Sequence, residues 1–105
     1  MIGKTVTVTI DRPLGSTHPK HKDMIYEVNY GYVKGVMAPD NQEQDCYVLG
    51  VEVAVKSFTG KVIAIIERED DCEDKWIVSN RDFTNEEIMS KVHFVEKYFK
   101  STIRR

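Results

Sequence analysis

The chain opens with a strict alternation of polar and apolar residues. Residues 5–10 read TVTVTI, so that the three aliphatic side chains share one side of the segment. Because successive side chains of a strand point to opposite faces, this period of two predicts a half-buried β-strand. Pro13 cannot donate to a strand ladder and Gly15 favours a turn, so the strand is predicted to end before them.

Further apolar runs predict the other strands. They lie at residues 24–33, 45–55, 62–66 and 75–78, and polar loops occupy residues 17–23, 38–44 and 67–74. In the run 45–55 the apolar residues alternate, which places four of them on one predicted face: Tyr47, Leu49, Val51 and Val53.

The last part of the chain has the period of a helix. Thr84 and Glu87 form a capping box, the usual start of a helix. Apolar residues then recur at spacings of four, three, four and four, at Ile88, Val92, Val95, Phe99 and Ile103. This stripe predicts a helix that continues to the two final arginines, whose charge suits a helix C-terminus.

Strands followed by one closing helix predict the fold class. The expected fold is mostly β (α+β), a small OB-like closed β-barrel with one C-terminal α-helix. With 105 residues and 12.1 kDa, the chain is expected to form a single domain over residues 1–105.

Composition excludes several function classes. A net charge of −2 leaves no basic surplus to neutralise nucleic-acid phosphates, so no nucleic-acid partner is expected. The sequence contains no apolar run of membrane-spanning length and no apolar signal-peptide core. Its cysteines, Cys46 and Cys72, form neither a CxxC motif nor a disulfide-dense pattern, which favours a reducing compartment. We therefore expect a cytoplasmic location and no membrane partner.

Carboxylates gather at two places beside predicted strands. Asp40 and Asp45 flank one strand entry, and a second loop carries Glu69, Asp70, Asp71, Glu73 and Asp74. A barrel could bring both loops to one rim, where a hard cation such as Mg²⁺ would relieve the repulsion between carboxylates. Lys75, at the edge of the second loop, could then meet phosphate charge. The alternative is that both clusters are solvated loops.

One block of the chain carries a specific resemblance. Residues 26–32 read YEVNYGY and, seven residues later, residues 40–45 read DNQEQD. This block resembles the signature of the family I soluble inorganic pyrophosphatases, Tyr-Pro-x-Asn-Tyr-Gly-Tyr/Phe followed by Asp-Gly-Asp-Pro-x-Asp, with the same spacing. The resemblance implies Asp40 and Asp45 as ligands of Mg²⁺, with Asp45 and Tyr30 in catalytic roles.

Three acidic candidates follow from looser matches. Residues 73–75 read EDK and resemble the family's Asp-x-Lys, which implies Glu73 as a metal ligand and Lys75 as a catalytic and phosphate-contacting lysine. Asp70 is the candidate for the metal-binding aspartate just upstream. Residues 8–16 resemble the family's Glu-x-Pro-x-Gly-Ser segment, with Asp11 where a glutamate is usual, so Asp11 is a further candidate ligand.

The remaining candidates would bind substrate. Residues 92–98 read VHFVEKY and resemble the family's His-Phe-Phe-x-x-Tyr-Lys, which places Tyr98 on a phosphate-binding tyrosine. Lys100 could replace the lysine that normally follows. The family's segment with a phosphate-binding lysine and arginine is missing here, and Lys20 in the loop 17–23 is a candidate electrostatic substitute.

One departure bears directly on catalysis. Gln42 replaces the central aspartate of the family's motif, and a neutral amide can orient a water molecule but cannot take its proton.

Three interpretations of the function therefore stay open. The chain is a Mg²⁺-dependent hydrolase of inorganic pyrophosphate or a related phosphoanhydride, a non-catalytic binding module for a phosphorylated ligand or nucleotide, or a barrel without either role. The resemblance also implies a small phosphate substrate and association into a homo-oligomer.

Overall fold

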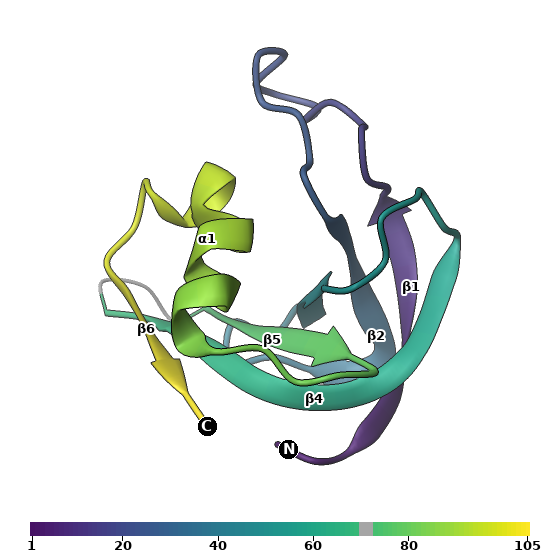
Figure 1. The fold of residues 1–105 in the computed structure, drawn as a ribbon, viewed down its shortest axis with the longest axis vertical. Helices are drawn as coiled ribbons and strands as arrows, with labels where there is room; N and C mark the ends of the chain where they lie inside the picture. Colours follow the sequence, from purple (N-terminus) through teal and green to yellow (C-terminus); the bar gives the residue numbers. More distant parts are fainter. Residues whose placement is uncertain (70–72) are drawn as a thin grey trace.

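The computed structural model describes residues 1–69 and 73–105. Within these residues the chain forms strands and one helix in the order β1 (Thr5–Arg12), β2 (Asn29–Met37), β3 (Glu43–Val48), β4 (Ser57–Arg68), β5 (Asp74–Ser79), α1 (Asn85–Glu96) and β6 (Ser101–Arg104) (Figure 1). In this part of the chain, α1 lacks the length and apolarity needed to cross a membrane.

Five of the strands close into a mixed barrel. They follow the order β1-β2-β3-β5-β4, and β1 pairs back with the beginning of β4. The β3–β5 pair is parallel and the other pairs are antiparallel. β4 is the long curved strand in Figure 1, and its second half also pairs with β6. The predicted fold class, a mostly β closed barrel with one helix near the C-terminus, is confirmed.

The two faces of the strands supply two separate cores. β3 shows the division clearly, because Cys46 and Val48 point into the barrel while Tyr47 points outward with Leu49, the residue that follows the strand. The outward side packs against Ile88 and Val92 of α1 in one cluster of buried residues. The segment before β2 contributes further residues to this cluster. The outer face of the barrel beneath α1 is therefore the place where polar side chains can be held on a rigid support.

The start of α1 confirms the sequence prediction, and its end does not. Thr84 accepts from the backbone N–H of Glu87, and the Glu87 carboxylate accepts from the N–H of Thr84, so the predicted capping box is present. The helix ends at Glu96, however, and the chain turns back to form β6, in which Ile103 pairs with Ile66. The prediction of a helix reaching residue 105 is therefore wrong.

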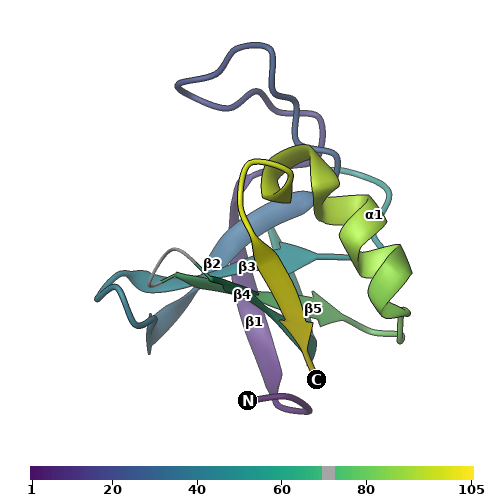
Figure 2. The same ribbon diagram turned by 90° about the vertical axis from the view of Figure 1, so that its left-hand side faces the viewer.

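Several strand limits also differ from the prediction, and β2 continues to Met37, four residues beyond the predicted end. Residues 24–28 precede β2 and bond to the loop before them, since the N–H of Tyr26 donates to the carbonyl of Ser16. β3 ends at Val48, because Gly50 has a φ of 89° and turns the chain, so Val53 is 65% exposed and does not continue the predicted face. β4 starts at Ser57, five residues before the predicted run. Figure 2 shows the loop between β1 and β2 projecting beyond the barrel.

Candidate functional site

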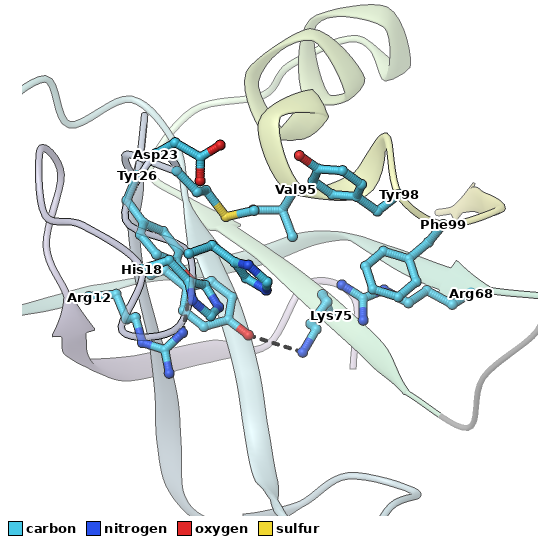
Figure 3. Close-up of a pocket in the computed structure, with 12 residues that line it drawn as sticks. Arg12, His18, Asp23, Tyr26, Arg68, Lys75, Val95, Tyr98 and Phe99 are labelled. Atoms are coloured by element: carbon cyan, nitrogen blue, oxygen red, sulfur yellow. Dashed lines mark hydrogen bonds between the residues drawn. The ribbon is translucent and has the colours of Figure 1, made fainter.

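A cavity of about 410 Å³ lies between the outer face of the barrel, the end of α1 and the loop that joins β1 to β2. Three cationic side chains line it, one from each of three strands: Arg12 of β1, Arg68 of β4 and Lys75 of β5. Figure 3 shows Lys75 between the two arginines. Asp23 is the carboxylate that lines the cavity among the described residues.

Lys75 is the centre of the site. Its side chain is 5% exposed, and its Nζ donates to Tyr30 Oη at 3.0 Å, to Asp45 Oδ2 at 2.8 Å and to Glu73 Oε1 at 3.1 Å. An ammonium has three N–H groups, so each has an acceptor. Burial alone would lower the pKa of Lys75, but the oxygens of Tyr30 and Asp45 raise it above its ordinary value. The group is therefore a fixed positive charge and not a proton acceptor.

Tyr30 presents a hydroxyl group to the same cavity. Burial raises the pKa of this phenol, and the opposing effect of the Lys75 charge is smaller. The phenol therefore keeps its proton, and because its oxygen accepts from Lys75, that proton can be donated to a ligand. Tyr30 sits beside Tyr47 in the β2–β3 register, and the two rings meet edge to face with centroids 5.1 Å apart.

Arg68 is held from behind by the end of α1. Its Nε donates to Glu96 Oε1 at 3.2 Å and its Nη2 to Glu96 Oε2 at 2.8 Å, while Nη1 donates to Glu73 Oε2 at 2.8 Å. Glu96 also accepts from the hydroxyl of Tyr47 at 2.6 Å. The guanidinium stacks on Phe99, with Cζ 3.7 Å from the ring centroid. Five N–H groups minus these three donors leaves two without an acceptor among residues 1–69 and 73–105, and these two can be offered to a ligand.

Arg12 enters through an irregularity at the end of β1. The register between β1 and β2 shifts between Ile10 and Arg12, which brings Arg12 opposite Tyr30. Its Nη1 donates to Tyr26 Oη at 2.8 Å, and the rest of its guanidinium lines the cavity.

Sequence reasoning missed Arg12, Arg68 and Glu96. Arg12 stood beside Pro13 and read as part of a turn, and Arg68 stood at the edge of an acidic loop. The available signal for Arg68 was the strand period of two, which places it on the same face as Ala64 and Ile66 of the apolar run. Glu96 had none, because it lies next to the predicted apolar stripe of the helix rather than within it.

Five of the predicted site residues lie in or beside the cavity. Tyr30, Lys75 and Tyr98 line it, and Tyr98 is 64% exposed. Asp45 and Glu73 both accept from the ammonium of Lys75, so one carboxylate of each predicted acidic cluster lies beside the same lysine.

The other predicted residues lie elsewhere. Asp40 Oδ1 accepts from the N–H of Gln42 at 3.1 Å, which closes the turn between β2 and β3. Lys20 and Lys100 are exposed and do not line the cavity. Asp11 lies in β1 and does not line the cavity. Burial raises the pKa of Asp11, the charge of Arg12 lowers it, and the charge of Asp45 raises it further. Asp70 lies outside the described residues.

The donor set does not fit a Mg²⁺ ion in this arrangement. Within residues 1–69 and 73–105, no group of three or more His, Cys, Asp or Glu side chains is placed to hold a metal. Asp45 and Glu73 share the ammonium of Lys75, and the second oxygen of Glu73 accepts from Arg68. A hard cation needs oxygen ligands that a protein cation does not already occupy.

Comparisons with known proteins bear on the fold. Neither known protein families nor curated proteins yield a match to this sequence. Solved structures do match. An inorganic pyrophosphatase from Ehrlichia chaffeensis superimposes with a TM-score of 0.72 at 16% identity, covering 96% of this chain and 85% of that chain. Those from Coxiella burnetii and Helicobacter pylori give TM-scores of 0.69 and 0.65 at 17% and 16% identity, covering 99% and 96% of this chain and 86% and 82% of those chains. The chain therefore has the fold of these pyrophosphatases.

Proposed function

We propose that the cavity binds a small molecule carrying linked phosphate groups, with inorganic pyrophosphate as the reference ligand. The observation that carries this proposal is the convergence of Arg12, Arg68 and Lys75 on one cavity. Guanidinium groups form strong hydrogen bonds with phosphate oxygens, and the planar fork of arginine suits two of these oxygens at once. Lys75, whose three N–H groups already have acceptors, contributes its positive charge.

The surrounding groups suit an anion because cations face the cavity and carboxylates stand behind them. Asp45 and Glu73 orient Lys75, and Glu96 orients Arg68. None of these three carboxylates lines the cavity. A phosphate group entering it would meet the free N–H groups of the arginines and the hydroxyl of Tyr30.

Hydrolysis of pyrophosphate is the second candidate function, and the likeness of the fold to solved pyrophosphatases favours it. Water attack needs a proton acceptor. Lys75 and Tyr30 both hold their protons. Asp45 does not itself line the cavity, but it contacts Lys75 through Oδ2 alone, so its Oδ1 is the candidate acceptor for a water molecule beside Lys75. The Mg²⁺ cofactor implied by the family resemblance belongs to this second function.

A calorimetric titration with pyrophosphate tests binding, and phosphate release with and without Mg²⁺ tests hydrolysis. Arg12→Met should weaken binding about 10–100-fold, because a hydrogen bond from a charged group contributes about 1.5–3 kcal/mol. Lys34→Met is the matched control, since this exposed residue of β2 does not line the cavity. Equal affinity in all three proteins, or no binding by the parent, would refute the proposal. A nucleoside diphosphate in parallel tests the nucleotide alternative.

Two sequence expectations belong to the same proposal. A cytoplasmic location suits a site for a small soluble phosphate compound, and association into a homo-oligomer follows from the family resemblance. Light scattering coupled to gel filtration checks the second expectation.

A further inference from the structure

Two buried cations occupy the space between the carboxylates of the site. Lys75 lies 2.8 Å from Asp45 and 3.1 Å from Glu73, and Arg68 lies 2.8 Å from Glu73. The side chains of Lys75 and Arg68 are only 5% and 4% exposed, so their charges are enclosed by the protein. The repulsion between the carboxylates of Asp45 and Glu73, which a divalent cation was expected to relieve, is relieved here by Lys75 and Arg68.

We propose that Lys75 and Arg68 take the place of divalent cations in this cavity, so that the chain binds its phosphate ligand without a metal. The inference rests on the proposed function, and it specifies the condition under which binding occurs.

Electrostatics at Lys75 supports the proposal. For Mg²⁺ to reach both Asp45 and Glu73, the ammonium would have to give up two of its three acceptors while remaining enclosed. An enclosed charge without partners is strongly unfavourable, and a doubly charged ion beside it would add repulsion. Metal binding therefore competes directly with a salt bridge already present.

Arg68 is fixed in a way that keeps its charge at the cavity. Glu96 is fully buried and holds the guanidinium by two hydrogen bonds, and Phe99 covers one of its faces. The side chain cannot swing away without leaving the buried Glu96 unpaired. Its two remaining N–H groups therefore stay available at the cavity, where they can attract a phosphate group in the way that a bound metal ion would.

Binding of Mn²⁺ without a phosphate ligand tests the substitution directly. In electron paramagnetic resonance titrations, the parent protein should not retain Mn²⁺ at submillimolar concentrations. Lys75→Met frees Asp45 and Glu73 and should gain one Mn²⁺ site with at least tenfold higher affinity, while Lys34→Met should behave like the parent. One tight Mn²⁺ site in the parent, or a folded Lys75→Met without the gain, would overturn the inference. The parent titration decides the matter if Lys75→Met fails to fold.

A second titration separates this inference from the proposed function. Methylenediphosphonate, a pyrophosphate analogue that resists hydrolysis, is titrated into the parent protein with EDTA and then with excess Mg²⁺. Affinity with EDTA within threefold of that with Mg²⁺ supports both proposals. Binding only with Mg²⁺ overturns the metal-free inference and leaves the proposed function standing. Absence of binding under both conditions refutes the proposed function itself.

Discussion

The guanidinium of Arg68 and the carboxylate of Glu96 join the end of β4 to the end of α1 through two hydrogen bonds, at 3.2 and 2.8 Å. Both side chains are almost completely buried, at 4% and 0% exposure. The hydroxyls of Tyr47 and Ser101 donate to the same carboxylate, so its oxygens are fully engaged. This pair therefore fixes the end of α1 to the end of β4, and both of these segments contribute residues to the lining of the cavity.

Replacing Glu96 with glutamine should therefore destabilise the protein severely. Glu96→Gln removes the carboxylate that holds Arg68 by two hydrogen bonds and leaves the enclosed guanidinium with Glu73 alone among the described carboxylates. Breaking a buried ion pair in this way costs up to about 3–5 kcal/mol. Urea unfolding at low temperature measures the loss. Glu67→Gln is the matched control, because Glu67 and Arg104 form a half-exposed pair whose loss costs about 1 kcal/mol or less. Equal losses in the two variants would contradict the structural role of Glu96.

The same carboxylate should give the stability a dependence on acid. Burial alone would raise the pKa of Glu96, but hydrogen bonds from Arg68 and Tyr47 and the charge of Arg68 lower it. A carboxylate with a lowered folded-state pKa contributes stability above its unfolded-state pKa, about 4.3, and loses it as the pH falls through the folded-state value. The difference in unfolding free energy between the parent and Glu96→Gln should be constant above about pH 5.5 and shrink below about pH 4. A difference that does not change down to pH 2 would argue against this linkage.

Gly31, in the centre of the tyrosine motif, is required for packing. A Cβ atom there would overlap the carbonyl oxygen of Thr9 and lie 2.8 Å from Cα of Ile10, both in the paired strand β1. Gly31→Ala should cost at least about 3 kcal/mol or prevent folding, because backbone atoms must move apart. Gly35→Asn is the control, since that glycine has open space and a φ of 77°, which asparagine tolerates for about 1 kcal/mol. Thermal unfolding of both variants checks this, and a stable Gly31→Ala would contradict it.

The parts of the fold that were predictable are those with a local cause. The alternation in β1 and the capping box at Thr84 depend on residues a few positions apart, and both are present. The end of α1 was not predictable, because the spacing of Phe99 and Ile103 also suits a helix. Ile103 instead pairs with Ile66, a contact across 37 positions that no local pattern reveals.

The site divides in the same way. The placement of charges beside predicted strands pointed to Asp45 and Lys75, and the family resemblance added Tyr30, because a resemblance carries information about distant contacts that composition lacks. Arg68 was not found, because its partner Glu96 is far along the chain and both look like surface charges in the sequence. The role of Lys75 also differs in part from the expectation, since it neutralises two carboxylates as well as facing the cavity.

The remaining prediction concerns Gln42 and the hydrolysis reaction. From the sequence, a carboxylate at this position is expected to supply the missing general base, which contributes about 10²–10⁴-fold to a rate. In the structure Gln42 is exposed in the turn after β2, where its N–H donates to Asp40 and its carbonyl accepts from Ala38. It does not line the cavity.

Gln42→Asp should therefore leave phosphate release from pyrophosphate within about threefold of the parent rate, well below a general-base effect. The assay is run with and without Mg²⁺, and unfolding curves confirm that the variant is folded. Asp45→Asn is measured alongside, because it removes the candidate proton acceptor of the second function and should lower any release that the parent shows. A hundredfold gain in Gln42→Asp would place the reacting water at the β2–β3 turn, and the hydrolase interpretation would then replace the binding one.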